Sequence, residues 1–147
     1  MAIKVNVERE HITMPKELAA FCKKIIAAVL QGQEVDNVVV TLILTNDEAI
    51  AHINKTYRKK KGPTDVISFA YREAPMPHVT TKEHLGDIFI SLETAQRQAI
   101  EYGVTLKEEL KRLLVHGVLH LLGYDHEQSI YKKRKMQEKE KEIMQKI

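Results

Sequence analysis

The sequence is poor in cysteine, in aromatic residues and in long apolar runs, and each shortage excludes a class of protein. Of 147 residues one is cysteine and none is tryptophan, and aromatic residues make up only 5%. The single Cys22 excludes an internal disulfide, and the scarcity of rings means that aliphatic side chains must fill the core. No apolar run approaches the roughly 18 residues that cross a bilayer.

The start of the sequence also lacks the features of an export signal. Residues 1–10, MAIKVNVERE, contain no apolar segment and no small-residue cleavage site. Together with the scarcity of cysteine, this favours a cytoplasmic protein. Hydrophobic residues make up 44% and charged residues 29%, which is typical of a globular chain, and we expect a single domain over residues 1–147.

Positive charge is concentrated in two short runs rather than spread over the chain. The formal net charge is only +3, but residues 58–61 read RKKK and residues 132–135 read KKRK. Such runs usually form solvated surface. Two of them in one small domain favour a polyanionic partner.

Hydrophobic periodicity predicts the element order β-α-β-α-β-β-α-α-α. The predicted strands cover residues 3–7, 38–44, 66–69 and 88–90, and the predicted helices cover 15–32, a short segment with Ile50 and Ile53, 91–102, a segment from Thr105 and a charged C-terminal segment from Ile130 to Met144. Thr45 with Glu48, and Thr105 with Glu108, resemble capping boxes, whereas Gly32 and Gly103 stand where helices end. The predicted fold class is α+β, a four-stranded mixed sheet with helices packed against it, and Cys22 is predicted to be buried.

The chemistry of the chain is concentrated in residues 116–126, HGVLHLLGYDH. His116 and His120 lie four residues apart, so on a helix they share one face and both imidazoles can reach one metal ion. Gly123 can stop that helix in a left-handed conformation and let the chain turn back, so that His126 supplies a third ligand. Three protein ligands leave a tetrahedral position open, which is the catalytic arrangement of zinc. We therefore predict a metallohydrolase domain that binds one Zn²⁺.

The spacing H-x-x-x-H-x-x-G-x-x-H is that of the metzincin peptidases, with one difference. Those enzymes carry a glutamate general base directly after the first histidine, where this chain has Gly117. The difference argues against a peptidase, although the metal ligands are present.

The same residues, with two further segments, resemble the YbeY family of bacterial rRNA maturation endoribonucleases. Residues 116–126 are similar to the family's HGxLHLxGYDH motif, residues 54–69 (NKTYRKKKGPTDVISF) to its YR…PTDVxSF stretch, and residues 85–91 (LGDIFIS) to a family strand. The resemblance extends from about Val38 onward. One departure is Lys61, where many members carry an acidic residue.

The resemblance implies a zinc-dependent endoribonuclease that acts on single-stranded RNA, in maturation of small-subunit ribosomal RNA and in ribosome quality control. It implies that His116, His120 and His126 bind zinc and that Arg58 is the functional arginine beside them. A guanidinium suits a phosphate clamp, although Arg58 also fits a surface loop. Asp125 could orient a ligand imidazole, move a proton or cap the turn. Tyr124 fits either packing or substrate contact.

Two other functions agree with the same residues. One is a metallohydrolase with another substrate, which the missing glutamate at Gly117 disfavours. The other is a non-enzymatic ribosome assembly factor in which zinc only stabilises the fold. Whether the protein is an endoribonuclease or an assembly factor, its basic runs fit RNA or the ribosome as partner. No membrane partner is expected.

Overall fold

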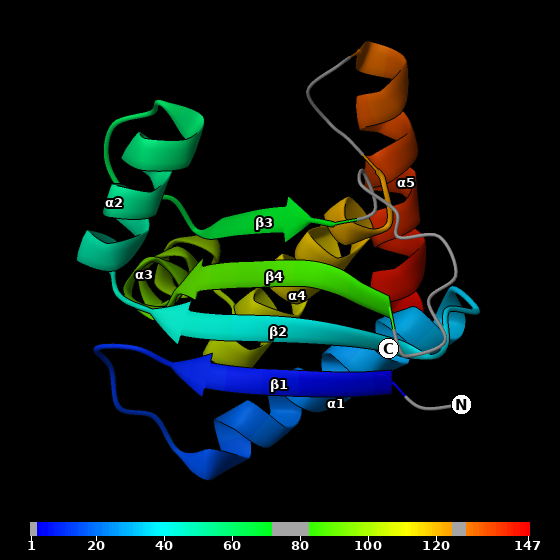
Figure 1. Ribbon diagram of the computed structural model, residues 1–147, viewed down its shortest axis with the longest axis horizontal. Coiled ribbons are helices and arrows are strands. Elements are labelled where there is room, and N and C mark those ends of the chain that lie inside the picture. Colours follow the sequence, from blue (N-terminus) through cyan, green and yellow to red (C-terminus); the bar gives the residue numbers. More distant parts are fainter. Residues whose placement is uncertain (1–2, 72–82, 125–128) are drawn as a thin grey trace.

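A computed structural model describes residues 3–71, 83–124 and 129–147, and its element order is the one that the sequence predicts (Figure 1). The elements are β1 (Ile3–Arg9), α1 (Lys16–Gly32), β2 (Val38–Thr45), α2 (Asp47–Arg58), β3 (Val66–Ala70), β4 (Glu83–Ser91), α3 (Leu92–Tyr102), α4 (Leu106–Leu121) and α5 (Ile130–Lys146). Within these described segments, no helix is both long and apolar enough to cross a membrane.

The four strands form one mixed sheet in the order β1-β2-β4-β3, which confirms the predicted sheet. β1 pairs with β2 in parallel and β2 pairs with β4 in parallel, whereas β3 runs antiparallel to β4 at the edge. The central strand β2 is buried along almost its whole length, as expected for its uninterrupted apolar sequence.

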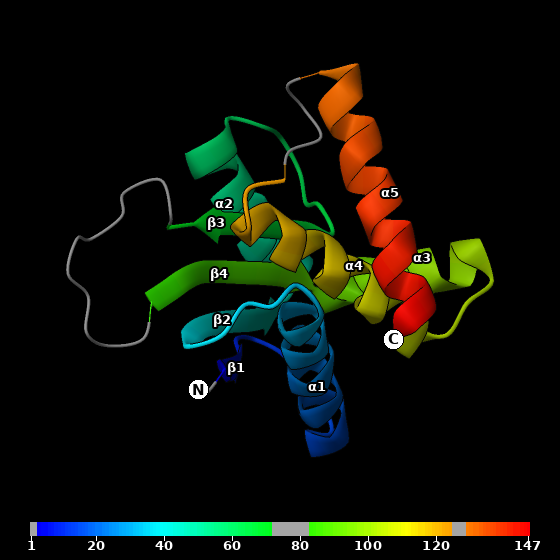
Figure 2. The same cartoon turned by 90° about the vertical axis from the view of Figure 1, so that its right-hand side faces the viewer.

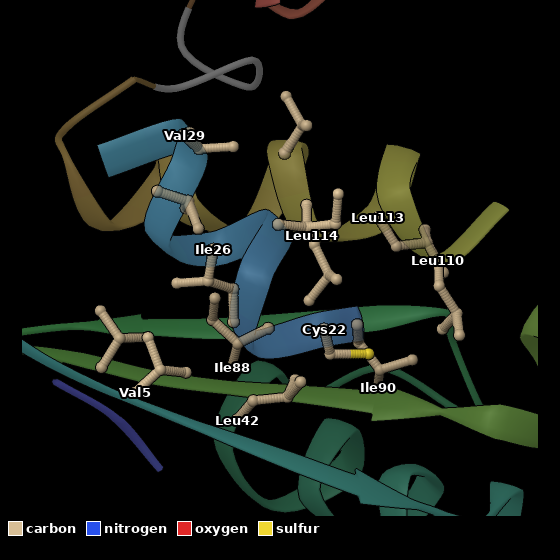
Figure 3. Close-up of a cluster of buried hydrophobic side chains, with 14 of the residues drawn as sticks. Val5, Cys22, Ile26, Val29, Leu42, Ile88, Ile90, Leu110, Leu113 and Leu114 are labelled. Carbon is tan, nitrogen blue, oxygen red and sulfur yellow. The ribbon is translucent and has the colours of Figure 1, made fainter. Parts of the chain in front are cut away.

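The core lies between one face of the sheet and helices α1 and α4. Figure 3 shows Val5, Leu42, Ile88 and Ile90 directed from the sheet toward these helices, with α2 on the opposite side. Helix α5 packs on the outer side of α4, as Figure 2 shows from the edge of the sheet. Cys22 is fully buried in this core, and burial raises the pKa of its thiol to about 12, so it packs as a small apolar side chain.

The predicted helix boundaries are correct where a side chain or a glycine can satisfy the terminal backbone groups. Thr105 and Glu108 form the reciprocal capping box at the start of α4. Ser91 caps α3, and Gly103 ends it with φ +67°. These contacts fix the start of the helix that carries His116 and His120.

One of the predicted boundary signals is wrong in detail. Thr45 belongs to β2, and the cap of α2 is Asn46, whose side chain accepts a hydrogen bond from the Ala49 amide. The capping signal at Thr45 thus lies one residue before the true cap. Helix α1 ends at Gly32, as predicted, and the left-handed backbone of the following turn is at Glu34, with φ +58°.

Gly86 allows β3 and the end of α4 to approach β4 closely. A bulge shifts the register of β4 against β2 at this position, pairing Val39 with His84 but Val40 with Gly86. A Cβ on Gly86 would lie 2.0 Å from the Phe69 carbonyl oxygen and 2.7 Å from Leu121 Cδ2. Backbone cannot yield by that much, so only glycine fits here.

A cluster of charged side chains around the buried Glu109 joins α4 to the segment that precedes β3. Glu109 is 1% exposed, and its carboxylate accepts hydrogen bonds from Arg112 Nε (2.9 Å) and from Gln98 Nε2 (2.6 Å). Gln98 Nε2 also lies 3.3 Å from Asp65 Oδ2, and the other Asp65 oxygen accepts from the Val66 amide at 2.8 Å. Hydrogen bonding to Glu109 raises the pKa of Arg112. Asp65, to which the sequence assigned no role, thus fixes the start of β3 relative to α3 and α4.

We expect Gly86→Ala to lower the free energy of unfolding by about 3 kcal/mol or more, because the added methyl group overlaps backbone. Gly32→Ala is the matched control: nothing lies within 4 Å of its added Cβ, so stability should stay the same or rise. Urea denaturation of both variants measures this. Equal stability of the two would contradict the close approach at Gly86.

We expect Arg112→Leu to cost about 3 kcal/mol, because it leaves the buried Glu109 carboxylate without its charge partner. The double variant Glu109→Leu with Arg112→Leu should recover at least half of that loss, since no buried charge remains. Urea denaturation at neutral pH tests both. A double variant less stable than Arg112→Leu would show that the cost arises from lost packing.

Candidate metal centre

Helix α4 is buried on most of its circumference, which fixes the direction of its few polar side chains. It packs against α1, α3, α5, β3 and β4. Its buried apolar residues are Leu110, Leu113, Leu114, Val115, Val118, Leu119 and Leu121. His116 and His120 are only partly buried and interrupt this apolar surface.

His116 and His120 lie one turn apart with their rings close together. The ring centroids are 4.9 Å apart and the ring planes make an angle of 72°. This juxtaposition confirms the predicted shared helix face. Two imidazoles at this separation can direct nitrogens at one ion from adjacent turns.

Glu140 of α5 contacts one nitrogen of this pair. Its Oε1 atom lies 2.5 Å from His116 Nδ1, and both side chains are 23% exposed. When the carboxylate is ionised and the imidazole neutral, Nδ1 donates this hydrogen bond and Nε2 keeps the lone pair that a metal ion requires. A carboxylate that holds the far nitrogen of a histidine is the usual outer partner of a zinc ligand. The residues present therefore fit a metal ion at Nε2.

Sequence reasoning missed Glu140, although a signal for it exists. Met136 and Ile143 are the buried residues of α5, and Glu140 lies four residues after the first and three before the second. Those spacings place it on the apolar face of an otherwise charged helix. An acidic residue on that face indicates a buried partner.

Gly117 packs directly against the sheet. A Cβ there would lie 3.1 Å from Ile88 Cγ2 and 3.2 Å from Ser68 Oγ, and the Ser68 hydroxyl donates to the Gly117 carbonyl at 3.4 Å. Position 117 of the helix therefore faces β3 and β4. A glutamate of the metzincin kind has no room at this contact, which agrees with the argument against a peptidase.

The helix ends as the glycine predicts. Gly123 has φ +101°, its amide donates to the His120 carbonyl at 3.0 Å, and the Tyr124 amide donates to the Leu119 carbonyl at 3.0 Å. These two bonds form a Schellman motif. Tyr124 is partly buried against the core, which favours its packing role.

The predicted third ligand, His126, and the predicted proton-handling residue, Asp125, lie outside the described residues. Within residues 3–71, 83–124 and 129–147, no three His, Cys, Asp or Glu side chains form a group that could hold a metal. The three-histidine site therefore stays a prediction, of which two histidines are in place.

Arg58 is the last residue of α2, next to Lys59, which ends the helix in a left-handed conformation at φ +58°. Figure 3 shows α2 on the side of the sheet opposite α4. The proximity of Arg58 to the histidines, which the family resemblance implies, stays a prediction.

Comparison with known proteins identifies the chain's relatives. Residues 4–147 match the family model described as Endoribonuclease YbeY. The Endoribonuclease YbeY of Aquifex aeolicus is 46% identical over 118 residues, covering 80% of this chain and 76% of the relative. That of Bacillus licheniformis is 41% identical over 156 residues, covering 98% and 94%.

A solved structure shares the fold. The solution structure of TM1509 from Thermotoga maritima superposes with a TM-score of 0.64 at 26% identity, covering 95% of this chain and 86% of that one. A family match over nearly the whole chain and relatives above 40% identity agree with the histidine motif. The chain belongs to the YbeY family.

Proposed function

We propose that this protein is a zinc-dependent endoribonuclease that cuts single-stranded RNA, in small-subunit rRNA maturation and ribosome quality control in the cytoplasm. Its relatives are named endoribonucleases, which supports the reaction class. The observation that carries the metal dependence is the pair of imidazoles 4.9 Å apart, one of them held at Nδ1 by Glu140.

Each residue of the proposed site has its own role. His116 and His120 hold the ion from adjacent turns of α4, with His126 as the third ligand. Glu140 keeps the proton of His116 on Nδ1 and fixes the ring plane. When bound, zinc supplies Lewis acidity toward a phosphoryl oxygen and an attacking water. Arg58 binds phosphate oxygens of the substrate through the planar fork of its guanidinium, and Asp125 handles the proton.

Removal of zinc should abolish cleavage of a labelled single-stranded RNA, and added Zn²⁺ should restore it. His120→Ala should lower kcat/KM by at least the roughly 10–100-fold that loss of an outer partner costs, because it removes a ligand. His52→Ala is the matched control, since His52 is exposed on α2. Gel analysis of product and elemental analysis of zinc content measure both effects.

The same assay separates the alternatives. Cleavage of casein without cleavage of RNA would indicate another metallohydrolase. Full support of rRNA maturation by a folded His120→Ala protein would indicate an assembly factor in which zinc is structural.

Glu140→Ala should weaken zinc binding roughly 10–100-fold, because His116 loses the contact that fixes its tautomer and ring plane. Glu140→Gln should lose less, since an amide oxygen still accepts from Nδ1. Glu138→Ala, on the exposed side of α5, is the control. Competition against a chromophoric chelator measures the affinity without reference to activity. Equal affinities for the Glu140→Ala and Glu138→Ala variants would remove Glu140 from the site.

A further inference from the structure

Half of the chain's aromatic residues gather on the sheet face opposite α1 and α4. Ile88 faces α4 at Gly117, so Phe89, the next residue in β4, points to the opposite face. Ser68 also faces α4, so Phe69 in β3 points away from it. Tyr71 follows two residues later and has the same direction.

The rings form two groups of contacts on this face. Tyr57 of α2 packs edge-on against Phe69 with centroids 5.5 Å apart, and Phe69 packs edge-on against Phe89 at 5.9 Å. Tyr71 packs against His84 at 4.9 Å. We call Tyr57, Phe69, Tyr71 and Phe89 the aromatic surface.

The aromatic surface is accessible. Tyr57 is 68% exposed and Tyr71 is 42% exposed, although aromatic residues make up only 5% of the chain. Single exposed tyrosines are common in soluble proteins. Exposed rings gathered around two half-buried phenylalanines indicate a binding surface.

The charge beside the aromatic surface is positive. Arg58 and the exposed residues Lys59, Lys60 and Lys61 follow Tyr57 directly. Asp87 of β4 also lies on this face, where it accepts a hydrogen bond from the Tyr71 hydroxyl and lies 3.3 Å from His84 Nε2. That hydrogen bond raises the pKa of Tyr71 to about 12, so its ring stays neutral at any working pH.

We infer that the aromatic surface and the basic residues 58–61 bind a segment of single-stranded RNA, by stacking unpaired bases on the rings and pairing phosphates with the cations. Stacking platforms beside cationic residues are the common means of holding single strands, and duplex RNA hides the base faces that stacking needs. The inference rests on the proposed function, because it states how the same substrate is held.

The edge strand connects this surface to the histidines. β3 carries Phe69 on one face and Ser68, bonded to Gly117 beside His116, on the other. β3 is at the edge of the four-stranded sheet, so the aromatic surface and the histidine pair lie on opposite sides of one edge strand.

Tyr57→Ala should weaken binding of a short fluorescent 2′-O-methyl RNA strand about 10-fold, within the 1–3 kcal/mol range of one stacked base. Tyr57→Phe should keep the affinity, because the ring remains. Tyr131→Ala is the matched control, since Tyr131 is 72% exposed and also precedes a basic run, 132–135, yet lies on α5. It should change affinity less than 2-fold. Fluorescence anisotropy of the zinc-loaded full chain measures all three.

Two outcomes would overturn the inference. One is equal RNA affinity of the Tyr57→Ala and wild-type proteins. The other is loss of binding to anionic phosphatidylserine vesicles by Tyr57→Ala with RNA affinity retained, which would assign the surface to a membrane. Failure of the proposed function looks different: the wild-type protein would cleave no RNA, yet would still bind it through Tyr57.

Discussion

The histidine pair is positioned by the close approach of α4 to the edge of the sheet. Gly117 lets the helix touch Ile88 and Ser68, and Gly86 lets the end of the same helix meet β4 beside the Phe69 carbonyl. A Cβ at Gly86 would overlap the Phe69 backbone and Leu121, and a Cβ at Gly117 would be in tight contact with Ile88 and Ser68. Because His116 and His120 lie on this helix, their position relative to the sheet depends on two positions that lack a side chain.

The sequence predicts the parts of this structure that depend on local contacts. The capping box at Thr105 and the turn at Gly123 each depend on residues a few positions apart, so the local sequence predicts both. The same holds for the shared face of His116 and His120. Strand pairing, the bulge at Gly86 and the contact between Glu140 and His116 depend on residues far apart in the chain. No local pattern determines such contacts, and Asn46 shows that even a local cap can be assigned one residue away.

The two faces of the sheet carry different kinds of side chain. One face carries aliphatic residues that pack under α1 and α4 and hold the histidines in place. The other gathers the scarce aromatic rings beside a basic run. Successive side chains of β3 and β4 point to opposite faces, so a shift of register by one residue would exchange the aliphatic and aromatic faces.

The burial of Cys22 has a consequence for how the protein handles metal and oxidants. Its thiol is enclosed between α1 and the sheet, and a pKa of about 12 keeps it protonated. A protonated, enclosed sulfur does not compete with imidazoles for zinc and reacts with electrophiles only when α1 separates from the sheet. Cys22 is the only cysteine of the chain, so its rate of alkylation measures how often the core opens locally. This measurement does not depend on whether a metal is bound at the histidines.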